Sequence, residues 1–228
     1  MDWKPREGSA TAAAPSHSVA DASAHPLANT RASVALKEFL SLIDDIPGGR
    51  VLDLGPAYQS TISFLIERGF QFATEDLLRG WREFVTTEEE RLRKAPVGEQ
   101  AEKVSQATLA EKFLRESLNS GEGTYCGVLL WDLLDYFDAE LVPRIIARLF
   151  KVLQPNGAIL ALFHGRPPAR FHRYRVLDTQ TIELVPAPTL AVHGHSFQNR
   201  EILDMFGEFR SSKTFVGRDH AREGLFLK

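Results

Sequence analysis

Apolar residues along the chain alternate between two spacings, and the alternation divides the chain into predicted helices and strands. From residue 32 to 43 apolar side chains recur at helical spacing, and a Pro-Gly-Gly turn follows. The apolar run 50–54 then predicts a buried strand, helical spacing returns over 61–68, and 70–74 predicts a second strand. Connections this short are typical of a βαβ unit, so we expect the two strands to be parallel.

The second half of the chain continues the alternation and then changes to antiparallel pairs. A continuous apolar run over 125–131 is typical of a strand covered on both faces. Two pairs of short apolar runs come later, each pair joined by a polar turn, and each pair predicts a hairpin. The remaining predicted elements are a helix over 139–153, a turn at 154–157, a strand over 158–163, hairpins over 171–185 and 212–227, and a short helix over 199–206.

Two stretches depart from this pattern. Residues 1–31 are rich in Ala, Ser and Pro without periodicity, which favours a disordered tail over an arm folded on a ligand or partner subunit. Residues 77–120 are charged and helical in spacing, although a third parallel strand is expected there. That strand is either short, near 113–118, or buried in a helical insertion. The organised domain is therefore 32–228, an α/β domain with a mostly parallel sheet.

Composition limits the function classes. The chain has 228 residues, 43% apolar and 25% charged, as expected for one globular domain. A net charge of −3 gives no reason to expect a nucleic-acid or membrane surface. Cys126 is the single cysteine, so no intramolecular disulfide can form, and a reducing compartment fits. With no signal-peptide pattern and no long apolar run, we expect a cytoplasmic protein.

The junction at Gly55 is the most informative point for chemistry. It follows the strand over 50–54 and precedes a helix, so backbone N–H groups meet at a helix N-terminus. In α/β folds this is where nucleotide-like ligands are held. The junction therefore predicts a ligand site at the carboxyl edge of the sheet.

Several segments, taken in order and spacing, resemble the class I S-adenosylmethionine (SAM)-dependent methyltransferase family over residues 33–228. Val-Leu-Asp-Leu-Gly at 51–55 is similar to the family's first motif. Asp76 stands 23 residues after Asp53, where the family carries an acid at the end of its second strand. The runs 125–132 and 153–160 are similar to the family's fourth strand and to its turn into the fifth. The terminal hairpin is similar to its last two strands.

The resemblance implies a seven-stranded Rossmann-like sheet with helices on both faces and a C-terminal antiparallel hairpin. It implies transfer of a methyl group from SAM to a small-molecule acceptor, with S-adenosyl-L-homocysteine (SAH) as product. One alternative is a catalytically inactive protein of this fold that serves as a binding or scaffold partner. Another is a nicotinamide-dependent oxidoreductase, but the chain lacks Gly-x-Gly-x-x-Gly. An Asn-Pro-Pro-Tyr type motif is also absent after 131, which counts against nucleic-acid methylation.

The resemblance also implies cofactor-binding positions. Backbone N–H groups after Asp53 would meet the methionine carboxylate, and Asp76 would accept hydrogen bonds from the ribose hydroxyls, with Glu75 as its substitute if the register slips. Of the family's glycines only Gly55 remains, and the proline after it lacks an N–H. The implied cofactor contacts are Asp53, Gly55, Pro56, Ala57, Tyr58, Asp76, Leu77, Leu114 and Trp131.

Candidate catalytic and acceptor-binding residues follow the fourth and fifth predicted strands. His164 ends the strand over 158–163 and is the candidate base, needed where the acceptor starts protonated. Asp132 is the second candidate catalytic residue, and Asp132 and Asp135 are candidates to hold an acceptor amine or hydroxyl. A helix cap or a solvated helix residue is an equal alternative for Asp135. Tyr136, like Trp131, either walls the acceptor or packs in the core.

A basic run follows the same edge. It begins at Arg166 and continues with Arg170, Arg173 and Arg175, and we favour a solvated hairpin face over a site for an acidic acceptor. Without further cysteines or a matched carboxylate set, we expect no metal site. The hairpin over 171–185 is a candidate lid or homodimer contact.

Overall fold

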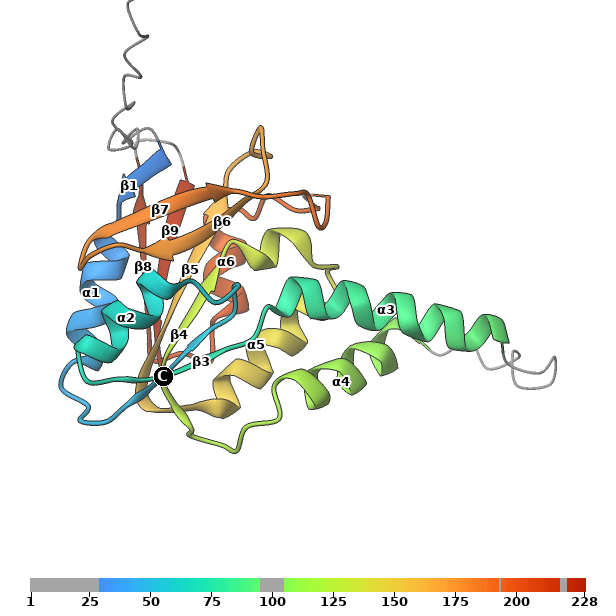
Figure 1. Ribbon diagram of the computed structural model, residues 1–228, viewed down its shortest axis with the longest axis horizontal. Helices are drawn as coiled ribbons and strands as arrows, with labels where there is room; N and C mark the ends of the chain where they lie inside the picture. The colour runs from blue at the N-terminus through green and yellow to red at the C-terminus, as the bar shows by residue number, and fades with distance from the viewer. Residues whose placement is uncertain (1–28, 95–104, 193, 218–220) are drawn as a thin grey trace, which may run out of the picture.

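The main sheet has six strands in the order β3-β2-β4-β5-β9-β8, in a computed structural model that describes residues 29–94, 105–192, 194–217 and 221–228 (Figure 1). The first four strands in this order are parallel, as the βαβ prediction requires. Strand β9 pairs antiparallel with β5, and β8 pairs antiparallel with β9, so the terminal hairpin is confirmed. The bounds are β2 Arg50–Asp53, β3 Gln71–Thr74, β4 Tyr125–Trp131, β5 Leu153–His164, β8 Ser211–Val216 and β9 Ala221–Leu227.

The prediction of seven strands was wrong by one for the described residues. The segment near 113–118, one of the two places considered for a third parallel strand, belongs to helix α4 (Gln106–Ser117) and the residues just after it. Ser105 caps this helix by accepting a hydrogen bond from the Thr108 N–H. Its buried residues Ala110, Phe113 and Leu114 lie at helical spacing on one face, so burial here selects a helix.

Helices cover both faces of the sheet (Figure 1). Helices α3 and α4 extend together to one side of the body, and residues 95–104 between them lie outside the described part. Residues 154–157, expected as a turn, belong to β5, whose register with β4 shifts between Tyr125 and Gly127. The remaining helices are α1 Val34–Ile43, α2 Gln59–Glu67, α3 Leu77–Lys94, the 3-10 helix η2 Leu133–Tyr136, α5 Leu141–Val152 and α6 Asn199–Met205.

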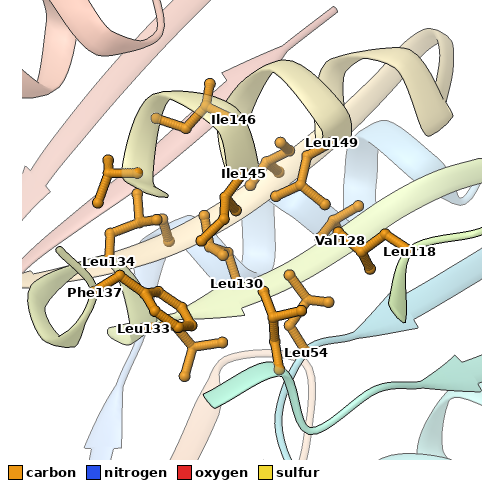
Figure 2. Packing of buried hydrophobic residues seen from close by; sticks show 14 of the residues in the cluster. Leu54, Leu118, Val128, Leu130, Leu133, Leu134, Phe137, Ile145, Ile146 and Leu149 are labelled. Atoms are coloured by element: carbon orange, nitrogen blue, oxygen red, sulfur yellow. The ribbon is translucent and has the colours of Figure 1, made fainter. Parts of the chain in front are cut away.

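Alternate residues of the central strands belong to two separate hydrophobic cores, one on each face of the sheet. On one face Val128 and Leu130 pack with Ile145 and Leu149 of α5, as Figure 2 shows. On the other face Leu129 and its neighbours pack against α1 and α2. This two-residue period explains why β4 is buried along its whole length and reads as a continuous apolar run.

A second, three-stranded antiparallel sheet lies across one end of the main sheet (Figure 1). It consists of β1 (Thr30–Ala32), β7 (Thr181–Pro186) and β6 (His172–Val176), so the predicted hairpin over 171–185 is confirmed. Strand β1 includes the last two residues of the expected tail, and residues 1–28 lie outside the described part. No described helix is both long and apolar enough to cross a membrane.

Candidate functional site

The carboxyl ends of the parallel strands bring four polar side chains to one edge of the main sheet. Asp53 ends β2, Asp76 follows β3, Asp132 follows β4, and His164 ends β5. Strand β6 covers this edge: Arg173 contacts Asp76, Tyr174 contacts Asp132, and the Tyr174 ring stacks on Trp131, which donates to Asp53. The four polar side chains therefore lie at one edge of the main sheet, and the small sheet lies on this edge.

Asp53 is a buried carboxylate with one oxygen satisfied. Its Oδ1 accepts hydrogen bonds from the Gly55 N–H (2.9 Å) and from Nε1 of Trp131 (2.6 Å). Its Oδ2 has no hydrogen-bond partner within the described residues. Burial raises the pKa of Asp53 to about 7, against the two hydrogen bonds that lower it. This carboxylate can accept a further donor from a ligand.

Trp131 occupies the space next to the glycine of the turn. A Cβ placed on Gly55 would lie 3.2 Å from Cδ1 and Nε1 of the indole. The indole stacks on Tyr174 of β6, with centroids 5.5 Å apart and planes at 14°. The Trp131 backbone has a φ of 55°, an uncommon conformation for a bulky residue, at a register shift of β4. The side chain of Trp131 therefore occupies the space beside Gly55 that a ligand would need for close approach to the turn.

The rest of the turn is held from β6. Pro56 is half-buried and Ala57 is exposed. Tyr58 is the N-cap residue of α2 but makes no side-chain capping bond, and the Arg175 guanidinium lies 5.9 Å from its ring centroid. One turn into α2, Thr61 Oγ1 accepts a hydrogen bond of 2.9 Å from the Val176 N–H. Strand β6 is therefore fastened to the N-terminus of α2.

Asp76, the expected ribose acceptor, forms an ion pair. Nη2 of Arg173 lies 2.8 Å from Oδ1 and 3.0 Å from Oδ2 of Asp76. Arg173 is 5% exposed, so the prediction of a solvated face was wrong for this member of the basic run. Arg175 pairs instead with Glu183 on β7. Burial, and then the charge of Asp76, raise the pKa of Glu75.

Asp135 and His164 form a second polar group at the end of β5. Oδ2 of Asp135 accepts from the His164 backbone N–H (2.8 Å) and lies 3.1 Å from its Nδ1. Burial lowers the pKa of His164, but the Asp135 hydrogen bond and the charge of Asp132 outweigh it, so the pKa is raised. Burial raises the pKa of Asp132 to about 6, and its Oδ2 accepts from the Tyr174 hydroxyl at 2.9 Å.

Three other predicted residues lie apart from these contacts. Leu77 is a core residue at the start of α3, and its N–H donates to the carbonyl of Leu54. Leu114 lies on α4 and lines a groove shared with Arg144 and Arg148 of α5, not a strand end. Arg166 is exposed after β5. Leu114 therefore lies on a helix and not in the short strand that was one of the two interpretations of this segment.

Tyr136 belongs to the polar group of β5 rather than to an open wall. Its ring packs edge-on against Phe171, with centroids 5.2 Å apart. Burial raises its pKa, and the charges of Asp132 and Asp135 add to this effect. Of the two interpretations from sequence, an acceptor wall or a core residue, the packing of Tyr136 agrees with the core residue.

Sequence reasoning missed Arg173 and Tyr174 as residues of the site. The signal that marks them is position: both lie on the strand that follows the candidate base, in a hairpin that the sequence presents as a possible lid. In β6 they are consecutive buried residues, which simple alternation does not predict.

The high pKa of Asp53 predicts a pH-dependent stability. The unfolded chain releases this proton near pH 3.8 and the folded chain near pH 7, so the folded state binds more protons between these values. Its stabilising contribution is complete below pH 3.8 and is lost as the pH rises through 7. Between about pH 5.5 and pH 8, we expect the unfolding free energy to fall by about 2 kcal/mol more in the parent than in Asp53→Asn.

Thermal or denaturant unfolding at the two pH values measures this difference. Asp138→Asn, at an exposed position, serves as the matched control and should follow the parent protein. Equal pH dependence in Asp53→Asn and the parent would show that Asp53 is ionised throughout the range.

Comparison with known proteins gives structural matches only. The sequence matches no protein-family model and no curated protein. Among solved structures, 1,6-didemethyltoxoflavin-N1-methyltransferase of Burkholderia thailandensis matches at 12% identity, over 86% of this chain and 79% of its own, with a TM-score of 0.44. The PH0226 protein of Pyrococcus horikoshii matches at 14% identity, over 83% and 88%, with a TM-score of 0.44. A SAM-dependent methyltransferase from Mesorhizobium loti matches at 11%, over 84% and 98%, with a TM-score of 0.41. Likenesses this distant describe only what the chain is similar to.

Proposed function

We propose that the protein transfers a methyl group from SAM to a small-molecule acceptor. The observation that carries the proposal is Asp53, a fully buried carboxylate beside the glycine turn whose Oδ2 has no partner in the described part of the chain. A buried polar atom without a partner is costly, so such an atom at a ligand edge favours a ligand that donates to it.

Charge favours SAM over a dinucleotide. The edge carries Asp53 and Asp76 at the ends of neighbouring parallel strands. SAM carries an ammonium and a sulfonium against one carboxylate, whereas a dinucleotide carries an anionic pyrophosphate. Once Arg173 has left Asp76, the two carboxylates attract the first and repel the second. Pro56 also removes one of the N–H groups that a pyrophosphate would need.

The residues present fit SAM in kind. Asp53 would accept from the ammonium and Asp76 from the ribose hydroxyls, while N–H groups at the start of α2 would meet the carboxylate. When bound, SAM supplies a methyl group on a positively charged sulfur, which any well-placed nucleophile can attack. Asp76 would have to exchange its present partner, Arg173, for the ribose.

His164 is the proposed general base. Since its Nδ1 faces Asp135, Nε2 is the nitrogen that would take a proton from an acceptor hydroxyl or amine. Asp135 orients the ring and stabilises its charged form, so we assign it a positioning role rather than direct acceptor binding. Asp132 accepts a hydrogen bond from the neutral Tyr174 hydroxyl, so we assign it a positioning role as well.

The second candidate is a protein of this fold that does not bind SAM. The indole of Trp131 over Gly55 favours it, because this side chain fills the place of closest approach to the turn.

Titration calorimetry and thermal shift with SAM, SAH and NAD test the proposal. We expect SAM and SAH to bind and to raise the melting temperature, and we expect NAD to have no effect. A response to NAD alone would favour an oxidoreductase. Absence of any response to SAM and SAH, also in the variants described below, would favour the second candidate.

A further inference from the structure

We infer that β6 holds the cofactor site in a closed state and that Arg173 thereby sets the affinity for SAM. This inference rests on the proposed function. It adds to it a residue that competes with the cofactor, located far from the glycine turn in sequence and directly over the cofactor edge in the fold.

The first contact that supports this inference is the ion pair with Asp76. One guanidinium nitrogen of Arg173 contacts both oxygens of Asp76, and the pair is largely shielded from solvent, at 6% and 17% side-chain exposure. A ribose diol would need the same two oxygens. The cofactor and Arg173 therefore compete for one carboxylate.

The second contact places Tyr174 beside the same site. Its hydroxyl donates to Asp132, and its ring lies on the indole that covers Gly55. Arg173 and Tyr174 are neighbours on one strand, and the hydrogen bond from Val176 to Thr61 fastens the same strand to α2. Three successive contacts of β6 thus fall on the end of β3, the end of β4 and the start of α2.

The closed arrangement leaves charged atoms unsatisfied, which makes exchange for a ligand physically reasonable. Nη1 of Arg173 and Oδ2 of Asp53 are both buried and have no hydrogen-bond partner among the described residues. They belong to side chains of opposite charge that influence each other electrostatically. Opening β6 would release Nη1 to solvent and Oδ2 to the cofactor, and both changes lower the cost of opening.

The effect on binding follows from the population of the open state. When only a fraction of molecules is open, the apparent dissociation constant exceeds the intrinsic one by the inverse of that fraction. Removing a contact present only in the closed state raises the fraction and tightens binding. Removing a residue that contacts the ligand would instead weaken binding.

The test is titration calorimetry with SAH on four chains: the parent, Arg173→Gln, Arg68→Gln and the double variant Arg173→Gln with Asp76→Asn. We expect Arg173→Gln to bind SAH at least about tenfold more tightly than the parent. Arg68→Gln removes an arginine–carboxylate ion pair with Asp44 at the C-terminal end of α2, away from Asp76, and should leave the affinity unchanged. In the double variant the gain should be lost, because the carboxylate that would accept from both ribose hydroxyls is then absent.

Tyr174→Phe provides an independent route if Arg173→Gln folds poorly. It keeps the ring on Trp131 but removes the hydroxyl that donates to Asp132. We expect SAH to bind about threefold to tenfold more tightly, because the closed state loses one hydrogen bond from a neutral donor to the Asp132 carboxylate. Thermal unfolding of each variant without ligand confirms that it is folded.

The outcomes separate this inference from the proposed function. Tighter SAH binding by Arg173→Gln than by the parent, including binding that the parent lacks, supports both. Binding by the parent that is unchanged or weakened in Arg173→Gln and Tyr174→Phe overturns the closed state and leaves the proposed function standing. Absence of SAH and SAM binding in all four chains overturns both.

Discussion

Replacing His164 by Ala is expected to lower kcat for methyl transfer by about 10²-fold to 10⁴-fold, the range typical of general base catalysis. The effect requires an acceptor whose hydroxyl or amine is protonated before attack. The ring is held by Asp135 at 3.1 Å and its side chain is 16% exposed, so it is fixed yet reachable. SAH release, measured with an acceptor found by screening small phenols, alcohols and amines, gives the rate.

The pH dependence of kcat/KM distinguishes a base from a merely structural histidine. A base acts in its neutral form, and the pKa of His164 is raised above its ordinary 6.5. We therefore expect kcat/KM to rise with pH through a value above 6.5 in the parent protein. In Asp135→Asn the stabilising charge is lost, so the rising limb should move to lower pH while KM for SAM changes little.

His172→Ala is the matched control for His164. It removes a second histidine near the same edge, on β6, whose pKa is lowered chiefly by burial. We expect kcat to stay within about threefold of the parent. Equal losses in the two histidine variants, or an unchanged pH profile in Asp135→Asn, would exclude His164 as the base.

The main elements of the fold could be predicted because they follow hydrophobic periodicity. Strand β4 is buried on both faces, and its seven residues form an uninterrupted apolar run with sharp ends. The sequence could not exclude a third parallel strand within 77–120. The alternation of strands and helices called for a strand there, and the helical pattern of this segment was too weak to rule one out. Packing of Phe113 against Trp81 and Phe84 settles the segment as helix, and such contacts are long-range.

Part of the candidate site could likewise be predicted from the sequence, and part could not. Asp53, Asp76, Asp132 and His164 could be placed at one edge because parallel strands end together. Their partners on β6 could not be predicted, because each lies far along the chain: Arg173 is 97 residues from Asp76, and Tyr174 is 42 residues from Asp132. A basic run read from sequence gives no indication which arginine faces inward. That choice depends on how the small sheet meets the main one.

Replacing Trp131 by Ala is expected to cost about 3–5 kcal/mol of unfolding free energy, which would lower the melting temperature by roughly 10 °C. The side chain is 1% exposed, approaches Gly55, stacks on Tyr174, and donates the shorter of the two hydrogen bonds to Asp53. Its removal leaves a cavity and a buried carboxylate with fewer donors. Trp81→Ala, at a half-buried position on α3, is the control and should cost less.

The same variant separates the two candidate functions when SAH is added. Trp131→Ala uncovers Gly55, so a chain that binds SAM should gain stability from SAH as the ligand concentration rises above its dissociation constant. At about 100 times that constant the gain is about 2.7 kcal/mol, enough to offset much of the loss. A methyltransferase with a self-covered site predicts this recovery, measured as melting temperature against SAH concentration. An inactive relative, in which the indole permanently replaces the ligand, predicts a destabilised variant that SAH leaves unchanged.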